Sequence, residues 1–302
     1  MPIVIVGATA TGKSALAMAL ADRWLPRFGP VEIVSVDSMQ VYRGMDIGTA
    51  KPTVEQRAQV PHHLIDVLDP WDECELAWFQ RHALTAVAQI DSRDHRALLV
   101  GGTGLYHRAV VDGLDVPGQY PEVRSELEQN PDTEALHQQL AALDPLGATR
   151  MEPTNRRRVV RALEVSIGSG RPFSAFGPGL EQYPQHGWPM IGLRCDRAVQ
   201  ANQLATRVRA MIAAGLVVET ERLWTHPNGM SRTALQALGY REVIEHLRGE
   251  CSLAAAVDAT IVRTRQFAVR QERWFRRDPR IVWFDSESPD LVDQVAGTVE
   301  RS

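Results

Sequence analysis

The amino-acid sequence predicts an α/β protein in which an inserted all-helical domain interrupts a core built on a parallel β-sheet. Three observations support this prediction. Short β-branched runs alternate with segments of helical periodicity over residues 1–113. Prolines and glycines then divide residues 114–188 into short helical pieces. The rest of the chain returns to a strand pattern at residues 190–195 and continues mostly as amphipathic helix.

The composition is that of a globular protein. Apolar residues make up 44% of the 302 residues and charged residues 23%, which excludes disordered, collagen-like and coiled-coil chains. No run approaches the roughly 18 apolar residues of a membrane span, and the first residues lack the basic flank of a secretory signal. Cys74, Cys195 and Cys251 are too far apart in sequence for a CxxC zinc pattern. We therefore expect a cytoplasmic protein with reduced thiols and no membrane contact, acting as a monomer.

Charge is unevenly distributed along the chain. The net charge is −4 overall, but it is −8 over residues 1–150 and +4 over residues 151–302. The second half could therefore carry a surface that binds a polyanion. Only Lys13 and Lys51 are lysines, whereas the other 31 basic residues are arginines. Two interpretations of these lysines stay open: codon usage, or positions where a compact ammonium fits and a planar guanidinium does not.

Three predicted strands end at residues that can bind a ligand. The strands cover residues 3–6, 32–37 and 97–100, and a helix is predicted at residues 14–24. The first strand ends at Gly7, the second at Asp37 and the third at Gly101 and Gly102. Ligands of open parallel sheets bind beyond the carboxyl ends of the strands. We therefore expect these three strand ends to form one binding site.

The remaining elements define the domain boundaries. We assign residues 1–113 and 189–302 to the core and residues 114–188 to the helical insertion, which ends in a proline-rich linker from residue 172. In the second part of the core we expect a strand at residues 190–195, helices between residues 198 and 277, and a last strand at residues 280–284.

The segment after the first strand matches the pattern G-x-x-x-x-G-K-[ST] of a phosphate-binding loop. The pattern comprises Gly7, Ala8, Thr9, Ala10, Thr11, Gly12, Lys13 and Ser14. The glycines let backbone N–H groups point at phosphate oxygens, and the following helix adds the positive end of its dipole. Lys13 would neutralise phosphate charge, and the Ser14 hydroxyl would ligate Mg²⁺. The alternative is an ordinary glycine-rich turn between a strand and a helix.

Asp37 and Thr103 follow the second and third predicted strands. A carboxylate that faces a phosphate loop can act as a base or hold Mg²⁺ through water, and the alternative is a turn or capping residue. The Thr103 hydroxyl can make a hydrogen bond in the cleft, and the alternative is a plain helix N-cap. A phosphate loop alone leaves kinases, NTPases and diphosphate-handling transferases open.

Two clusters of arginines in the second half of the chain indicate an RNA partner. The first consists of Arg156, Arg157, Arg158 and Arg161, and the second of Arg263, Arg265, Arg270, Arg273, Arg276 and Arg277. Phe267, Trp274 and Phe275 lie within the second cluster, which suits contact with the RNA backbone together with base stacking. The alternative for either cluster is a solvated arginine-rich face. Tyr240 is a weaker stacking candidate, and we expect His62 and His63 to be structural.

Seven motifs, in this order, resemble those of the bacterial tRNA dimethylallyltransferases, also called tRNA isopentenyltransferases. The motifs are GATATGKS, DSMQVYRGMDIGTAKP, PHHLID, GGTGLY, RALEV, ALGYRE and RQFAVRQERWFR, and the resemblance runs from residue 3 to about residue 277. The segment from Asp37 to Pro52 is more diagnostic than the phosphate loop. The chain departs from the family at Ala8, Thr11 and Ser14, where Pro, Ser and Thr are frequent, and at Val269, where lysine is common.

The resemblance implies a P-loop core like that of nucleotide kinases, with an inserted helical domain that contacts tRNA. It implies transfer of a dimethylallyl group from dimethylallyl diphosphate to the exocyclic N6 amine of adenosine at tRNA position 37, 3′ of the anticodon, with release of diphosphate. By the same resemblance Asp37 is the base, Thr103 helps to hold the reacting groups, and Lys13 and Arg207 neutralise the diphosphate together with Mg²⁺. The residues implied to contact the anticodon stem-loop are Asp37, Ser38, Met39, Gln40, Thr103, Arg124, Arg157, Arg158, Val159, Val160, Arg161, Gly239, Tyr240, Arg241, Arg273 and Arg276.

Two other functions stay open at this point. A small-metabolite kinase would use the phosphate loop and Asp37 but would not need two arginine clusters. An RNA-binding module with a nucleotide switch would bind tRNA without consuming a prenyl donor. An adenylate isopentenyltransferase is disfavoured by the arginine-rich C-terminal third. Because the segment after Asp37 resembles an acceptor site for an adenine amine, we expect dimethylallyl diphosphate, and not ATP, to be consumed.

Overall fold

The computed structural model describes residues 1–177 and 179–301 and divides into two compact units. The core unit consists of Met1–Val111 and Gln185–Ser302, and the insertion unit consists of Asp112–Pro184. The sequence had indicated boundaries after residues 113 and 188, a few residues later on each side. Each unit has buried hydrophobic clusters of its own.

Six parallel strands form one sheet in the core unit, in the order β3-β2-β4-β1-β5-β6. The strands are β1 (Ile3–Gly7), β2 (Val31–Ser35), β3 (His62–His63), β4 (Arg96–Gly101), β5 (Met190–Arg194) and β6 (Ile281–Asp285). Because β4 lies between β2 and β1, the three strand ends that carry the predicted site are neighbours at one edge of the sheet. Strand β3 was not predicted, since two residues give no alternating pattern.

Helices cover both faces of this sheet. The helices of the core unit are α1 (Lys13–Phe28), α2 (Val54–Gln59), α3 (Leu76–Asp91), α4 (Gly104–Val111), α9 (Arg197–Ala213), α10 (Leu216–Trp224), α11 (Tyr240–Leu247), α12 (Leu253–Phe275) and α13 (Leu291–Val299), with the 3-10 turn η2 (Ala234–Gln236). Successive β1 side chains point to opposite faces, so Ile3 and Ile5 pack in the cluster of α1 and α13, whereas Val4 and Val6 pack in that of α3. Coverage of both faces is typical of a parallel sheet. Among the described residues, no helix has the length and apolar character to span a membrane.

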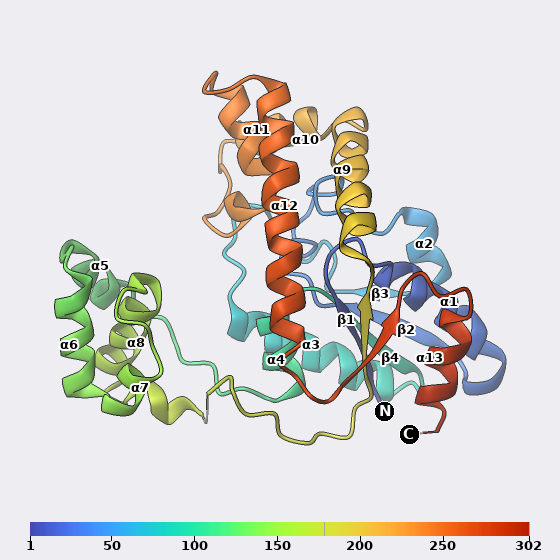
Figure 1. Cartoon of the computed structure of the whole chain (residues 1–302), viewed down its shortest axis with the longest axis horizontal. Helices are drawn as coiled ribbons and strands as arrows, with labels where there is room; N and C mark the ends of the chain where they lie inside the picture. Colours follow the sequence, from blue (N-terminus) through green and yellow to red (C-terminus); the bar gives the residue numbers. More distant parts are fainter. Residues whose placement is uncertain (178, 302) are drawn as a thin grey trace. The chain divides into compact units, whose positions relative to one another are not determined.

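Helices α9 and α12 run side by side and meet over the phosphate loop (Figure 1). Ala8 of the loop packs in a small buried cluster with Leu204 of α9 and Ala268 of α12, and each of the three is at most 4% exposed. Ser252 begins the 23-residue helix α12, and its side chain accepts the backbone N–H of Ala255 as an N-cap. These two helices therefore form part of the wall around the predicted site.

The insertion unit is built from short helices, drawn in green in Figure 1. They are α5 (Pro121–Gln129), α6 (Thr133–Leu143), α7 (Pro145–Thr149) and α8 (Arg156–Ser169), followed by the 3-10 turn η1 (Phe173–Phe176). Prolines begin α5 and α7, because the missing N–H of proline is not needed in a first helical turn. Leu136 and Leu140 of α6 pack against Val159 and Leu163 of α8 in the core of this unit.

Candidate functional site

The phosphate loop joins β1 to α1, as the motif requires. Gly7 approaches β5 so closely that a Cβ there would lie 2.6 Å from the carbonyl oxygen of Leu193, and Gly12 has a left-handed φ of 78°. Both glycines are therefore needed, one for close packing and the other for its backbone conformation. The Thr11 hydroxyl donates to the carbonyl of Ala8 at 2.9 Å and closes the loop. No side chain caps α1, so its first N–H groups are free to bind an anion.

Lys13 lies in a group of charged side chains at the carboxyl edge of the sheet. Its Nζ donates to the Ala8 carbonyl oxygen at 2.6 Å. Burial lowers the pKa of Lys13 from 10.5 to about 8; the Asp37 carboxylate opposes this shift, whereas the Arg207 guanidinium adds to it. Asp37 and Arg207 are therefore close enough to Lys13 to act on its charge.

Asp37 forms a turn with one carboxylate oxygen. Its Oδ1 accepts the backbone N–H groups of Met39 at 2.8 Å and Gln40 at 3.3 Å. In the described part of the chain, Oδ2 has no hydrogen-bond partner. Asp37 therefore acts as a turn residue through Oδ1, as the alternative interpretation expects, while Oδ2 remains available for a substrate. Ser38, which follows Asp37, is half-buried.

Gln40 uses its side chain to hold its own segment together. Its Oε1 accepts from the Ser35 hydroxyl at 2.8 Å, and its Nε2 donates to the carbonyls of Thr49 at 3.2 Å and Ala50 at 3.3 Å. The amide is thus already engaged within the protein, so contact between Gln40 and RNA stays a prediction.

Thr103 begins α4, and its carbonyl accepts the N–H groups of Tyr106 at 3.0 Å and His107 at 3.1 Å. Its hydroxyl makes no hydrogen bond to a described residue, so it does not act as a side-chain cap. The glycines on either side are tightly covered by α12. A Cβ at Gly102 would lie 2.3 Å from Nε2 of Gln271, and a Cβ at Gly104 would lie 2.1 Å from Cδ1 of Trp274. The GGTG stretch needs glycine at these positions because of α12.

Two buried glutamines from helices outside the phosphate loop hold this loop in place. Gln271 of α12 accepts the Thr9 N–H at 2.8 Å and donates to the Gly102 carbonyl at 2.8 Å. Gln200 of α9 donates to the Thr9 carbonyl at 3.0 Å. The two side chains belong to residues that are 8% and 9% exposed. Sequence reasoning missed both, and only the position of Gln271 within the RQFAVRQERWFR motif could have drawn attention to it.

A pocket of about 310 Å³ opens beside the loop. Its lining residues are Ala10, Thr11, Gly12, Gln203, Arg207, Ser286 and Glu287. Burial lowers the pKa of Arg207, and the Asp37 carboxylate opposes the shift. The position of Arg207 on this pocket is consistent with its predicted contact with the diphosphate. Gln203, Ser286 and Glu287 were not predicted.

Lys51 holds the segment from Asp37 to Pro52 in place. Its Nζ donates to the Tyr42 carbonyl at 2.6 Å, to Asp46 at 2.7 Å and to Asp66 at 2.5 Å, and its side chain is 2% exposed. The Lys51 ammonium donates to three oxygens that surround a single nitrogen, and a planar guanidinium could not make this set of hydrogen bonds. Lys51 is therefore a structural residue, and the use of lysine there is explained.

A buried carboxylate orders the turn of the same segment. Glu219 of α10 accepts the backbone N–H groups of Asp46 at 3.1 Å, Ile47 at 3.0 Å and Gly48 at 3.3 Å. The Tyr240 hydroxyl also donates to Glu219, at 2.5 Å. The prediction that Tyr240 stacks on an RNA base is wrong, because this residue is fully buried and its ring covers Gly48.

The neighbours of Tyr240 differ in their exposure. Gly239, with a φ of 92°, precedes α11, and its N–H is accepted by Glu242 at 2.7 Å. Arg241 is exposed and pairs with Glu245 at 3.2 Å. Of the ALGYRE residues predicted to bind RNA, Arg241 is therefore the one with a side chain at the surface.

The insertion unit presents arginines around an open pocket of about 470 Å³. The lining residues are Arg124, Glu128, Arg156, Arg157 and Val160. Arg157 and Arg158 are exposed and form no ion pair with a described residue. Arg161 instead pairs with the buried Glu164 at 2.7 Å and donates to the Pro117 carbonyl at 2.9 Å. Arg161 is thus mainly structural, contrary to its prediction as a phosphate contact.

Two valines of the same helix point inward. Val159 is 0% exposed and Val160 2% exposed, and both pack in the core of the insertion unit. The prediction that the Val159 side chain contacts RNA is therefore wrong, because this side chain is buried and does not reach the surface.

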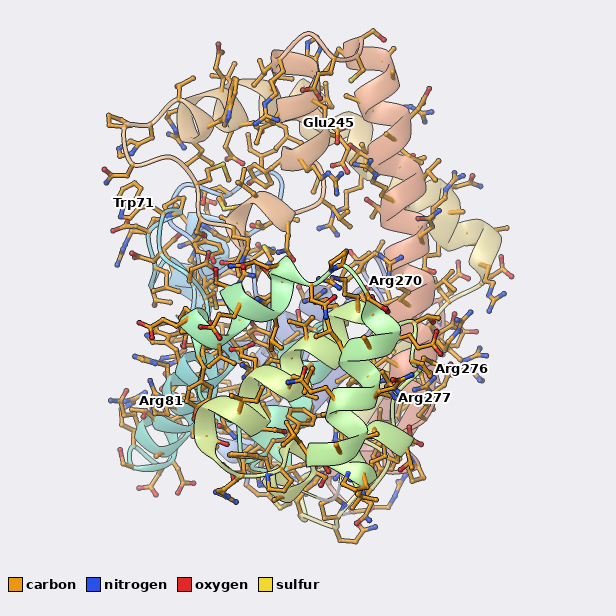
Figure 2. The ribbon with its side chains drawn as sticks, turned by 90° about the vertical axis from the view of Figure 1, so that its left-hand side faces the viewer. Trp71, Arg81, Glu245, Arg270, Arg276 and Arg277 are labelled. Carbon is orange, nitrogen blue, oxygen red and sulfur yellow. The ribbon has the colours of Figure 1, made fainter. Side chains whose placement is uncertain are left out.

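Helix α12 carries most of the second arginine cluster, and Arg276 and Arg277 follow its last residue. Figure 2 labels Arg270, Arg276 and Arg277. Arg270, Arg273 and Arg277 are exposed and form no ion pair with a described residue. Arg276 pairs with Glu272 at 2.6 Å. A spacing of three residues places Arg270 and Arg273 on one face of the helix. Phe275 is buried in the core, so it does not offer a stacking surface.

His62 and His63 are structural, as expected. His62 contacts the carbonyl of Val60 at 2.7 Å through Nδ1, and His63 contacts Glu32 at 2.6 Å through Nε2. Glu32 lies near the start of β2, away from the carboxyl ends of the strands. Neither histidine belongs to the phosphate site.

The residues of the site fit a Mg²⁺ ion that binds together with phosphate. Within residues 1–177 and 179–301, no group of three His, Cys, Asp or Glu side chains could hold a metal ion. Mg²⁺ usually takes one or two protein oxygens and completes its coordination with phosphate oxygens and water. The Ser14 hydroxyl, exposed at the start of α1, is such an oxygen.

A phosphate loop between the central strand β1 and α1 of a parallel sheet defines a P-loop protein. Residues 40–278 match the family model for IPP transferase. A tRNA dimethylallyltransferase of a Nocardioides species is 46% identical, with coverage of 99% of this chain and 96% of the relative. That of Thermobifida fusca is 45% identical, with coverage of 98% and 93%. The chain belongs to the IPP transferase family.

Solved structures of related proteins have the same fold. The tRNA isopentenylpyrophosphate transferase of Bacillus halodurans is 36% identical, with a TM-score of 0.72 and coverage of 99% of this chain and 97% of that chain. A eukaryotic dimethylallyltransferase acting on tRNA, 24% identical, superposes with a TM-score of 0.80 over 99% of this chain and 78% of that chain. The latter similarity concerns the fold.

Proposed function

We propose that this chain transfers a dimethylallyl group from dimethylallyl diphosphate to the exocyclic N6 amine of adenosine at tRNA position 37 and releases diphosphate. Membership of the IPP transferase family supports the reaction class. The observation that carries the assignment is the phosphate loop after β1, with Arg207 of α9 lining the pocket beside it and Asp37, which follows β2, acting on the charge of Lys13. A metabolite kinase and a nucleotide-dependent switch are disfavoured by the same family membership.

Asp37 supports the acceptor half of the reaction. The adenine amine is a weak nucleophile, because its lone pair is delocalised into the ring, so a base that removes its proton is useful. The turn fixes Asp37 through Oδ1 and leaves Oδ2 to accept that proton. The base must leave its stack to reach such a site. The Thr103 hydroxyl, which has no partner among the described residues, can orient one of the reacting groups.

The phosphate loop supports the donor half. As the bond between N6 and C1 of the dimethylallyl group forms, the bond between C1 and the diphosphate oxygen breaks, and its electron pair leaves with diphosphate. The free N–H groups at the start of α1, together with Lys13 and Arg207, stabilise this charge. Bound Mg²⁺, held partly by Ser14, would supply further neutralisation of the diphosphate. Diphosphate resembles the terminal half of ATP, so the loop does not by itself require a nucleotide.

Exposed arginines support binding of the tRNA backbone. Arg157 and Arg158 of the insertion unit and Arg273 of α12 have side chains at the surface without acidic partners among the described residues. Such arginines bind phosphates and release counterions. We infer that they contact the tRNA, with the core unit holding the donor.

The test is a nucleoside analysis of unmodified tRNA that has been incubated with the purified protein, Mg²⁺ and dimethylallyl diphosphate. We expect isopentenyladenosine to appear in amounts equal to the diphosphate released, and no diphosphate release when tRNA is left out. The Lys13→Ala variant should lose transfer. ATP hydrolysis stoichiometric with turnover, or full transfer by Lys13→Ala, would contradict the proposal.

A further inference from the structure

We propose that Gln271 is a positioning residue that keeps the phosphate loop and the Thr103 segment in register, an inference that rests on the proposed function. The amide of Gln271 joins two segments that are far apart in the chain. Its Oε1 accepts the Thr9 N–H of the loop at 2.8 Å, and its Nε2 donates to the Gly102 carbonyl at 2.8 Å. Gly102 directly precedes Thr103, so one side chain sets the spacing between the donor site and that hydroxyl.

The chemistry of the amide is fixed by its two partners. A backbone N–H requires an acceptor, and a backbone carbonyl requires a donor, so only one orientation of the Gln271 amide satisfies both. An ionised carboxylate would place a second acceptor against the Gly102 carbonyl, and an aliphatic side chain would leave both backbone groups without partners. Glutamine, and a protonated glutamic acid, meet both requirements at this length.

The surroundings keep the amide in place. Gln271 is 8% exposed, and its Nε2 lies 2.3 Å from where a Cβ of Gly102 would be, so the backbone of the Thr103 segment is in direct contact with α12. Gln200 donates to the Thr9 carbonyl at 3.0 Å and fixes the other side of the same residue. Thr9 is therefore held from two helices, and a displacement of Gln271 would move the loop relative to Thr103.

The same helix bears an exposed face with Arg270 and Arg273. Gln271 itself does not belong to that face, because its side chain is directed into the core unit. Loss of its amide should therefore change the catalytic step and leave tRNA affinity nearly unchanged. A loss of catalytic rate without a loss of tRNA affinity indicates a positioning role, whereas a general loss of structure would lower both.

The test compares Gln271→Glu and Gln271→Leu with the wild type in the transfer assay between pH 6 and pH 9. At pH 8 we expect kcat to fall about 10- to 100-fold in both variants, because small misplacements in an active site have effects of this size. The tRNA dissociation constant should stay within about twofold. As the pH falls, the kcat of Gln271→Glu divided by the kcat of the wild type should rise, since the protonated carboxyl group again donates a hydrogen bond to the Gly102 carbonyl. Gln271→Leu should show no such recovery.

Gln89→Glu is the matched control, because Gln89 is exposed on α3 and its side chain makes no hydrogen bond to a described residue. It should follow the wild type at every pH. If Gln271→Leu does not fold, the pH dependence of Gln271→Glu still decides the question. If the kcat of Gln271→Glu relative to wild type stays constant with pH, or if both variants have the wild-type kcat, the inference is overturned. Absence of transfer by the wild type would instead refute the proposed function.

Discussion

The two carboxylate oxygens of Asp37 have different surroundings, which separates its place in the fold from its proposed role as a base. Its Oδ1 forms the turn that begins the long diagnostic segment, whereas its Oδ2 has no partner among the described residues. Asparagine retains the oxygen that accepts the two backbone N–H groups but lacks the basic carboxylate. The substitution Asp37→Asn therefore separates the two roles.

We predict that Asp37→Asn lowers kcat by about 10² to 10⁴, the usual contribution of a positioned base. The fold and the tRNA dissociation constant should change little, because the turn is preserved. Transfer kinetics and binding titrations measure the two effects, and Asp91→Asn, at an exposed position of α3, is the control. A parallel loss of binding and rate would indicate a structural aspartate, and retained activity would exclude a role as base.

Lys13 should make diphosphate binding depend on pH. Burial lowers its pKa to about 8, so the ammonium that attracts the anion is present below this value and is lost above it. We expect the affinity for inorganic diphosphate to weaken between pH 7 and pH 9. In Lys13→Arg the charge persists, and this component of the pH dependence should disappear. Calorimetric titrations of both proteins measure the difference, and identical profiles would contradict the assignment.

Residues with a motif were easier to predict than residues without one. The glycines, Lys13 and Asp37 are recognisable because phosphate binding restricts residue types at fixed spacings. Gln271 was missed, because a glutamine in a helix has no such signature and its partners are backbone groups far away in the chain. Tyr240 was misassigned because its sequence pattern is ambiguous. An aromatic residue beside an arginine is typical of both a surface that stacks on bases and a packed core.

At the scale of elements, helix α8 exposes arginines and packs apolar side chains on different faces. Val159 and Leu163 face the core of the insertion unit, and Arg157 and Arg158 are exposed. Arg161 pairs with the buried Glu164 and supports the unit. Helical periodicity predicted the amphipathic character of such segments, but it could not tell which arginines had acidic partners. The acidic partners of these arginines lie in other segments of the chain or in the next turn of the same helix.

We predict that Arg157→Ala combined with Arg158→Ala flattens the salt dependence of tRNA binding by about 1 to 2 units on a log–log plot. Each lost phosphate contact removes a little less than one released counterion. Arg81→Ala, an exposed arginine of α3 labelled in Figure 2, is the control and should leave the slope unchanged. Arg161→Ala should lower the melting temperature instead. An unchanged slope in the double variant would mean that these two arginines do not touch the RNA backbone.

For the molecule as a whole, the proposed site lies at the carboxyl ends of the strands, and a cluster of ionisable side chains lies near the start of β2. Glu32 near the start of β2 is 3% exposed and contacts His63 and His95 at 2.6 Å each, and Arg93 at 2.9 Å. Burial acts to raise the pKa of Glu32, but the hydrogen bonds from these three side chains outweigh it and lower the pKa to about 2. The sequence did not indicate this cluster, because its members belong to three separate segments.

We predict that Glu32→Gln destabilises the protein near neutral pH by about 3 kcal/mol, the lower part of the range for breaking a buried ion pair. Because the pKa in the folded state is below the ordinary value of 4.5, the Glu32 contribution is fully present above pH 4.5 and is lost as the pH falls toward 2. The stability difference from wild type should therefore narrow in acid. Denaturant unfolding at several pH values measures it, with the exposed Glu221→Gln as control. A difference that does not vary with pH would contradict this account.

The attachment of Thr9 to α12 has a consequence for synthesis of the chain. The phosphate loop leaves the ribosome before its partner Gln271, which follows 262 residues later. At bacterial-type translation rates of about 5 to 20 residues per second, that interval lasts on the order of tens of seconds. During that time the nascent loop lacks the contact that fixes Thr9 against Gly102. A nascent chain that ends before α12 therefore contains the complete phosphate-binding motif without the bond that orders it, and the anion site matures only after α12 has been synthesised.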